Sequence, residues 1–384
     1  MVEKYSKVKN TLCVLPFTHL ATHPDGNVTP CCESKLFASN GKKTLNLNID
    51  SIKDIRDSES FNQLKQDMLN GVKNDICNFC YKREEKGIES KRIRENNRWG
   101  LNKSTYKSFL NNPLISVELR LGNTCNLKCL ICHPWSSSKW NEDAEVVGYE
   151  KMTIDRTWFK DKKVYDELTK YSQEVKHLWF NGGEPTLIKE HYYLLEKLIE
   201  ENKNSDITLE YHTNGSNFPD RLIKLWKKFK RVDITLSIDD IYDRLYYQRF
   251  PIKHEEVQKN INKIKKANQG NIQMVVIPTV SLYNVFNLDN LYNFYKKIDI
   301  KINLFNYLNF PTHLAIHNIP EKYKNRLLKR YKNTLPEYFH TELEYNLYSR
   351  ESKGLDKFKD FTKKLDSHRK VSILNYLPEY VDIF

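Results

Sequence analysis

The fold is decided by the stretch Leu121-Gly-Asn-Thr-Cys125-Asn-Leu-Lys-Cys129-Leu-Ile-Cys132 of this 384-residue chain. Its spacing, C-x3-C-x2-C, can hold three irons of a cubane and leave the fourth iron open to chemistry. The preceding run Ile115-Ser-Val-Glu-Leu-Arg-Leu alternates apolar and polar residues, which predicts a strand that ends at the loop. Zinc sites favour paired C-x2-C units with four ligands, so a zinc knot or a set of buried thiols is the weaker alternative.

A second motif follows further along the chain, His177-Leu-Trp-Phe-Asn181-Gly182-Gly183-Glu184-Pro185, which is typical of a buried strand that ends at a glycine pair. Together with the cysteine loop it resembles the radical S-adenosylmethionine (SAM) superfamily and its GGEP motif. The resemblance implies that the strand end at Asn181 and the backbone of Gly182 and Gly183 approach SAM. Glu184 would accept a charge-assisted hydrogen bond from the SAM ammonium. Alone, Gly-Gly-Glu-Pro is more typical of a tight turn.

The remaining apolar alternation predicts an α/β fold in which strands and amphipathic helices take turns. The predicted strands are 115–121, 176–181, 207–213, 232–238, 272–280 and 300–306. The predicted helices are 158–171, 187–201, 218–229, 254–268 and 287–297. Six strands separated by five helices predict a parallel sheet, and the resemblance implies a partial (β/α)6 barrel, open on one side for substrate.

Polar residues follow the later strands and are further candidates for SAM binding. By the resemblance, they would bind the ribose hydroxyls and the methionine carboxylate of SAM: Thr213, Asn214, Ser237, Asp239 and Arg249. An arginine suits a carboxylate because it can donate two parallel hydrogen bonds. Loop capping by the polar side chains, and a solvated surface charge for the arginine, are the alternatives.

Two positions depart from the pattern of the relatives. Ile131 stands where many carry an aromatic residue, and Asp240 stands where many of the peptide-modifying enzymes carry glycine. Adenine recognition at the cysteine loop is largely through backbone, so Ile131 stays a candidate cofactor contact, without aromatic stacking.

The other five cysteines lie within the first 80 residues. The element from Cys13 through Gly26 to Cys31, with the later Cys77-Asn-Phe-Cys80 pair, resembles the first part of SPASM/twitch auxiliary-cluster domains. The resemblance implies one auxiliary 4Fe-4S cluster on Cys13, Cys31, Cys77 and Cys80, with Cys32 as a spare. A hairpin turn at 23–27 would bring Cys13 and Cys31 together. A structural zinc ion is the alternative for these four cysteines.

The chain shows neither an apolar signal segment nor an apolar run of membrane-spanning length. Thiolate clusters need a reducing compartment, so we expect a cytoplasmic protein without disulfides. The formal net charge is +13, but the lysines are spread among acidic residues, and neither a dense basic stripe nor an RNA-binding motif is visible. This distribution argues against nucleic acid as a partner.

We therefore expect three parts: residues 1–112 as a twitch/SPASM-like auxiliary domain, 113–310 as the radical SAM core and 311–384 as a helical C-terminal extension. The resemblance implies an enzyme that cleaves SAM reductively and uses the 5′-deoxyadenosyl radical to abstract hydrogen. It further implies an external reductant such as flavodoxin or ferredoxin, and a precursor peptide or protein side chain as substrate. A sugar, nucleoside or antibiotic precursor is the alternative substrate, and a zinc-stabilised nucleic-acid-binding module is the alternative outside enzymes.

Overall fold

The computed structural model describes residues 2–153 and 157–384, which divide into two compact units. Unit 1 contains the described residues of 1–122, 154–210 and 224–232. Unit 2 contains those of 123–153, 211–223 and 233–384. The boundaries predicted near residues 112 and 310 separate regions with different sequence motifs. The two units are instead groups of residues that pack together, so they do not test those boundaries, which stay predictions.

Seven strands form the main sheet in the order β2-β1-β5-β6-β7-β8-β9. Strands β1, β5 and β6 pair in parallel, with Leu20 opposite Val117 and Val117 opposite Leu178. The strands are β1 (His19–Thr22), β2 (Val28–Thr29), β5 (Ser116–Arg120), β6 (His177–Asn181), β7 (Thr208–Thr213), β8 (Arg231–Leu236) and β9 (Ile272–Val276). This mostly parallel sheet agrees with the predicted partial barrel.

The helices between these strands lie where the apolar periodicity predicts them. Helix α12 (His254–Ala267) is representative, because it buries Val257, Ile261 and Ile264 at helical spacing and leaves its lysines exposed. The other connecting helices are α8 (Lys162–Lys170), α9 (Tyr192–Glu200), α10 (Asp220–Trp226) and α13 (Leu288–Lys297).

Three details differ from the sequence-based expectation. Helix α11 (Tyr242–Gln248) was not predicted, and the stretch 272–280 forms β9 and a separate short strand β10 (Thr279–Val280). The predicted strand 300–306 forms only β11 (Asn306–Tyr307), which pairs with β10 outside the main sheet, and a single bridge from Lys301 to Val275. The strand alternation breaks in this stretch, because Asn303 and Leu304 are both exposed between the buried side chains of Ile302 and Phe305.

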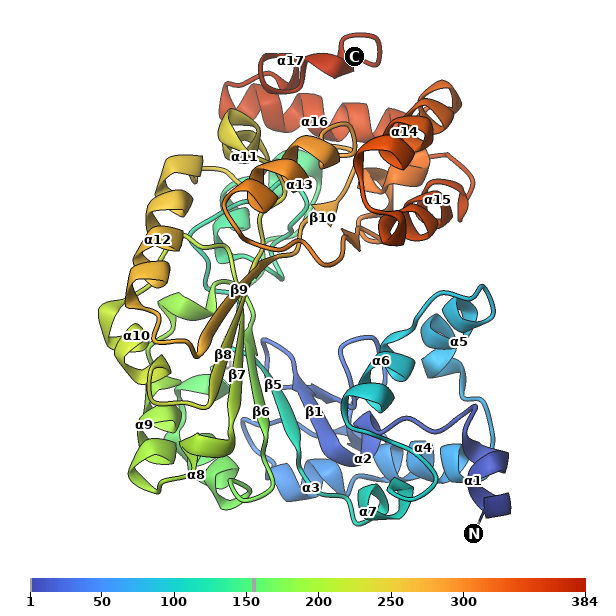
Figure 1. The fold of residues 1–384 in the computed structure, drawn as a ribbon, viewed down its shortest axis with the longest axis vertical. Coiled ribbons are helices and arrows are strands. Elements are labelled where there is room, and N and C mark those ends of the chain that lie inside the picture. The colour runs from blue at the N-terminus through green and yellow to red at the C-terminus, as the bar shows by residue number, and fades with distance from the viewer. Residues whose placement is uncertain (1, 154–156) are drawn as a thin grey trace. The chain divides into compact units, whose positions relative to one another are not determined.

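The described residues 2–110 of unit 1 form short helices and two hairpins. The turn predicted at 23–27 joins β1 to β2, whose residues pair antiparallel. Helix α2 packs against β1, and α4 and α7 pack against α2 (Figure 1). The elements of this part are α1 (Val2–Val8), α2 (Leu15–Thr18), β3 (Ser39–Asn40), β4 (Lys43–Thr44), α3 (Ile52–Arg56), α4 (Glu59–Leu69), α5 (Asn78–Glu84), α6 (Lys91–Arg98) and α7 (Tyr106–Leu110).

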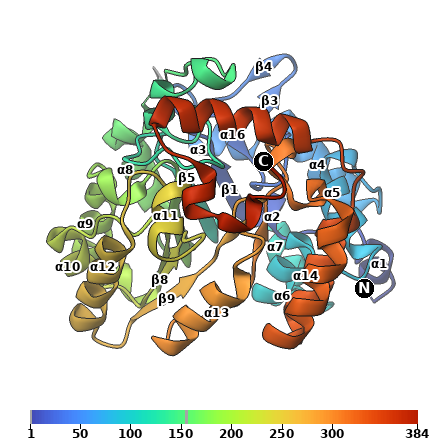
Figure 2. The same ribbon diagram turned by 90° about the horizontal axis from the view of Figure 1, so that it is seen from above.

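The C-terminal extension is helical, as predicted, and belongs to unit 2. Its last helix, α17, lies beside α11 (Figure 2). Its helices are α14 (Glu321–Thr334), α15 (His340–Tyr348), α16 (Leu355–Arg369) and α17 (Ile373–Tyr376). Within the described residues, no helix combines the length and the apolar character needed to cross a bilayer.

Candidate active site

The three-cysteine loop belongs to unit 2 and is held by side chains that follow the end of β7. Asn214, just after β7, donates from Nδ2 to Oδ1 of Asn126 at 3.0 Å, and the same Nδ2 lies 3.9 Å from Sγ of Cys125. Asn126 in turn donates to the hydroxyl of Ser216 at 2.9 Å. The predicted site residue Asn214 is therefore brought to the cysteine loop, and one of its contacts is a cysteine sulfur.

Arg249 also reaches this loop. Its Nη1 lies 3.8 Å from Sγ of Cys129, and its Nε donates to Oδ2 of Asp239 at 2.8 Å. The Arg249 side chain is 9% exposed, which excludes the alternative that it is a solvated surface charge. A hydrogen bond from the Cys132 thiol and then the positive charge of Arg249 lower the pKa of Cys129 below its usual value.

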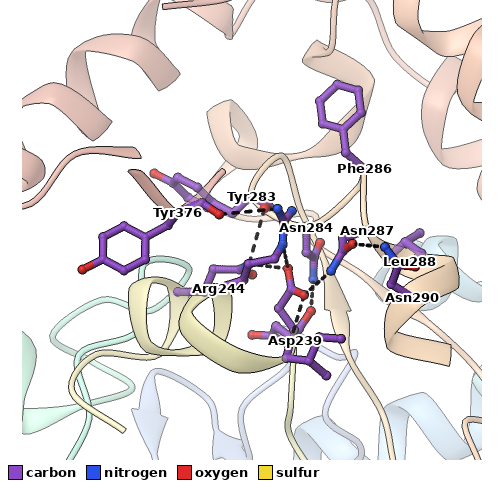
Figure 3. Close-up of polar contacts among 12 residues, drawn as sticks. Asp239, Arg244, Tyr283, Asn284, Phe286, Asn287, Leu288, Asn290 and Tyr376 are labelled. Atoms are coloured by element: carbon purple, nitrogen blue, oxygen red, sulfur yellow. Dashed lines mark hydrogen bonds and ion pairs between the residues drawn. The ribbon is translucent and has the colours of Figure 1, made fainter. Parts of the chain in front are cut away.

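Both carboxylate oxygens and the backbone oxygen of Asp239 accept hydrogen bonds. Its Oδ1 accepts from the backbone N–H of Thr279 at 2.8 Å, and its backbone oxygen accepts from Nδ2 of Asn284 at 2.9 Å. Figure 3 shows Asn284 directed at Asp239. The carboxylate is thereby set to orient Arg249, while the sequence-based expectation of a direct SAM contact stays a prediction.

The neighbouring Asp240 serves a different partner. Its Oδ2 accepts from Nε of Arg244 at 2.9 Å, and its Oδ1 accepts from Nδ2 of Asn287 at 2.6 Å. Nη1 of Arg244 also donates to Oε2 of Glu379, a residue that follows α17, at 3.1 Å. Figure 3 shows Arg244 within this network. Burial raises the pKa of Asp240, and the charge of Arg244 opposes that rise. The aspartate found where many relatives carry glycine thus ties α11 to the C-terminal segment.

The remaining predicted residues of unit 2 lie at strand or loop ends. The hydroxyl of Thr213 accepts from the backbone N–H of Gly215 at 3.1 Å, and the backbone of Ser237 donates to the Thr213 carbonyl at 2.8 Å. The Thr213 contact is the loop-capping alternative considered above. Ile131 and Ser237 are partly exposed, and their proposed contacts with SAM stay predictions.

Residues that support the cysteine loop from far along the chain were missed by the sequence analysis. Arg369, at the end of α16, donates to Oδ2 of Asp143 at 2.7 Å and to the backbone oxygen of Lys128 at 2.7 Å. Lys128 Nζ donates to the other oxygen of Asp143 at 2.7 Å. The indole of Trp140 donates to the carbonyl of Cys129 at 2.7 Å, and the Arg369 guanidinium lies over its ring. A buried ion-pair network therefore anchors the loop.

The glycine motif belongs to unit 1, and its geometry explains the glycines. Gly182 has φ +126°, and a Cβ there would lie 2.7 Å from the carbonyl oxygen of Gly122. The backbone N–H of Gly183 donates to the same oxygen at 3.1 Å. A side chain at position 182 would therefore collide with the end of β5. The glycine pair lets the two strand ends lie against each other.

Glu184 is buried and begins the short helix Pro185–Leu187. Its Oε1 accepts from the backbone N–H of Thr186 at 3.1 Å and from the Thr186 hydroxyl at 2.7 Å. Asn181 donates from Nδ2 to Oε1 of Glu118 at 2.8 Å. Glu184 is thus oriented by a capping contact, and its role toward the SAM ammonium stays a prediction.

The four N-terminal cysteines predicted as one ligand set line a single pocket in unit 1. Leu15, Leu64 and Met68 also line it, together with the charged residues Glu33, Lys91 and Arg92. Burial raises the pKa of the thiols at this pocket, to about 11 for Cys77. Backbone N–H groups nevertheless point at three of the sulfurs, those of Cys13, Cys31 and Cys80.

This donor set fits an iron–sulfur cluster. Buried thiolates require positive charge, which the irons of a cluster would supply beside the cations Lys91 and Arg92 of the lining. Backbone N–H groups would stabilise the charge on the sulfurs further. Within residues 2–153 and 157–384, no three cysteine, histidine or carboxylate groups are gathered closely enough to hold a single metal ion. The four cysteines line one pocket.

The spare Cys32 does not line that pocket. Its Sγ accepts from Nζ of Lys91 at 3.0 Å, and the Lys91 ammonium lies over the ring of Trp179. Burial, followed by the charge of Glu118, raises the pKa of Cys32 to about 11. The side chain of Glu118 is fully buried on β5, where it pairs with Arg120 at 3.1 Å. One face of β5 and β6 is therefore polar, while the opposite face is apolar.

Two protein families match the chain. The family described as "Radical SAM superfamily" matches residues 119–285, and the SPASM family, described as "Iron-sulfur cluster-binding domain", matches residues 13–81. The first match includes the three-cysteine loop and the glycine motif, and the second includes Cys13, Cys31, Cys77 and Cys80. A 4Fe-4S cluster and SAM are the cofactors of the first domain, and an auxiliary iron–sulfur cluster is that of the second.

Individual proteins resemble parts of the chain. A probable GTP 3′,8-cyclase of Methanocaldococcus jannaschii is 30% identical over 152 residues, which are 40% of this chain and 45% of that protein. Native anSMEcpe with bound AdoMet is 20% identical with TM-score 0.44, over 58% of this chain and 60% of the other. Streptococcus suis SuiB bound to S-adenosylmethionine is 14% identical with TM-score 0.39, over 79% of this chain and 64% of the other. The chain thus spans less than half the length of the cyclase.

Proposed function

Because this chain belongs to the radical SAM superfamily, we propose that it is an enzyme that cleaves SAM and uses the radical so formed on a second substrate. When bound, the 4Fe-4S cluster supplies the electron that cleaves SAM into methionine and a 5′-deoxyadenosyl radical, which abstracts hydrogen from carbon. The observation that carries the proposal is the C-x3-C-x2-C loop, with Asn214 and Arg249 both directed at its sulfurs.

Cys125, Cys129 and Cys132 would hold this cluster. The loop fits a cluster because it offers three cysteines, and because the Arg249 guanidinium and the Asn214 amide can donate to their sulfurs. The ion-pair network that includes Arg369 fixes the backbone of the loop. Arg249 and Asn214 stabilise negative charge on the thiolates in the water-poor interior. Thr213, Ser237, Asp239 and the 181–184 segment are proposed to bind SAM.

Cys13, Cys31, Cys77 and Cys80 are proposed to hold the auxiliary cluster. The match to the family described as "Iron-sulfur cluster-binding domain" over residues 13–81 supports a cluster over a structural zinc ion. We propose that the auxiliary cluster serves substrate turnover and that SAM cleavage does not need it. We also propose an external one-electron reductant such as flavodoxin or ferredoxin, and a cytoplasmic location, because two thiolate clusters require a reducing compartment.

The proposed substrate is a peptide or protein side chain. Residues 13–81 match the SPASM family, and the association of such domains with peptide-modifying enzymes, implied by the family resemblance, favours this class. Incubation of the reduced enzyme with SAM and either peptides encoded beside its gene or GTP tests the choice. A mass change in a peptide supports the proposal, and conversion of GTP alone would contradict it.

The test of the central proposal is metal and product analysis. Anaerobically reconstituted chain should hold about eight irons, and a triple Cys125→Ala, Cys129→Ala, Cys132→Ala variant about four. Dithionite-reduced wild type should release 5′-deoxyadenosine, and the triple variant should release none. A triple variant that keeps all of its iron would show that the loop is not a cluster site.

The matched control removes the other pair of cysteines. A Cys77→Ala, Cys80→Ala chain should also keep about four irons, yet still cleave SAM without substrate. Wild type with one zinc ion and about four irons would instead make the N-terminal site structural.

A further inference from the structure

We infer that Arg249, held in place by Asp239, sets the reduction potential of the cluster on the three-cysteine loop. This inference rests on the proposed function, because it assumes that iron occupies the loop. It assigns Arg249 an action on the cluster itself, in addition to any contact with SAM.

The first step is the position of the guanidinium. Its Nη1 lies 3.8 Å from Sγ of Cys129, within reach of a weak N–H to sulfur hydrogen bond. The Arg249 side chain is 9% exposed, so solvent screens its charge little. Charge near a cluster and hydrogen bonds to its sulfurs are among the factors that set its potential. A fixed cation beside Cys129 favours the reduced, more negative cluster and therefore raises the potential.

The second step is how the guanidinium is held. Asp239 accepts from Nε of Arg249 at 2.8 Å, and its own carboxylate is fixed by the backbone N–H of Thr279. The Asp239 side chain is 3% exposed. Asp239 does not bond to a cysteine among the described contacts, so it acts through Arg249 and is a positioning residue. Its own negative charge would have the opposite effect, since it disfavours the reduced cluster.

The chain offers a matched control in the adjacent pair. Arg244 lies five residues before Arg249 and binds Asp240, the neighbour of Asp239. Its guanidinium is directed at Glu379 and the C-terminal segment, as Figure 3 shows for Arg244 beside Tyr376. Removing Arg244 therefore removes the same charge from the same region without removing a contact to a cluster ligand.

The experiment is an anaerobic redox titration of the reconstituted full chain, followed by electron paramagnetic resonance. The signal that disappears in the triple cysteine variant belongs to the loop. Arg249→Gln should shift the midpoint potential of this signal to more negative values, and Arg249→Lys should give a smaller shift because the charge stays. Arg244→Gln should leave the potential within error of wild type. An unchanged potential in Arg249→Gln would overturn the inference.

The sign of a second shift tests the role of Asp239. In Asp239→Leu the potential should become more negative if the aspartate acts by holding Arg249, and more positive if it acts by its own charge. The second result would overturn the positioning role. Circular dichroism and iron content are measured for each variant, and the two Arg249 variants carry the test if Asp239→Leu does not fold. Absence of iron from the wild-type loop would instead refute the proposed function.

Discussion

Replacing Arg369 by methionine should destabilise the anchor of the cysteine loop. Arg369 makes two charge-assisted hydrogen bonds, to Asp143 and to the Lys128 carbonyl, and its side chain is 3% exposed. Removing one partner of a buried ion pair costs about 3–5 kcal/mol. Asp143 keeps a second cation, Lys128, at 2.7 Å, so the lower end applies and we expect a loss of about 3 kcal/mol.

The assay is urea unfolding of the metal-free chain under reducing conditions, with Lys364→Met as control. Lys364 is on the same helix and pairs with Asp360, but its side chain is half exposed, so its pair contributes little. Arg369→Met should lower the unfolding midpoint clearly, and the reconstituted variant should lose iron from the loop more readily. If Arg369→Met and Lys364→Met unfold at the same urea concentration, the buried pair stabilises the fold no more than an exposed one, and the reasoning is refuted.

Three further outcomes are expected. Glu184→Ala should weaken SAM binding about ten- to a hundredfold in equilibrium dialysis, since a charged hydrogen bond contributes roughly 1.5–3 kcal/mol; unchanged affinity would remove Glu184 from the site. Gly182→Ala should lower the thermal midpoint, because its Cβ would meet the Gly122 oxygen, whereas Gly270→Ala, also at positive φ but with open space around it, should have the smaller effect; equal effects would contradict the steric argument. Burial lowers the pKa of His191 to about 3, so between about pH 6.5 and 3 the imidazole binds a proton in the unfolded chain but not in the folded chain, and the free energy of unfolding should fall as the pH drops through this range. His191→Phe should make the free energy of unfolding less dependent on pH in unfolding titrations. An unchanged dependence would show that His191 does not cause it.

Local patterns predicted most of the fold. The strands from β5 to β9 and the helices between them follow from apolar periodicity, because each is determined by residues two to four positions apart. Such patterns are local and can be recognised without knowledge of the tertiary structure. The set of Cys13, Cys31, Cys77 and Cys80 was instead implied by the family resemblance, and the four residues line one pocket.

The missed features are short or depend on contacts between distant residues. Helix α11 is seven residues long and rich in polar and aromatic side chains, so it has no extended apolar period. The Asp143–Arg369 pair spans 226 residues, and nothing in either segment indicates its partner. The Lys91 contact with Cys32 spans 59 residues. Cys32 had no assigned role in the sequence analysis, and nothing in the sequence indicated that Lys91 would be its partner.

The pairing of β1 with β5 decides how far the chain can be shortened. These strands are neighbours in the sheet, yet the whole segment from residue 23 to 115 lies between them in the sequence. A protein trimmed to its barrel, beginning near residue 113, would lose β1 and leave the backbone N–H and C=O groups along one edge of β5 without partners. Unpaired strand edges of this kind pair with other chains and aggregate. The cysteine-rich segment therefore connects two neighbouring strands of one sheet, and it cannot be separated from the barrel by simple truncation.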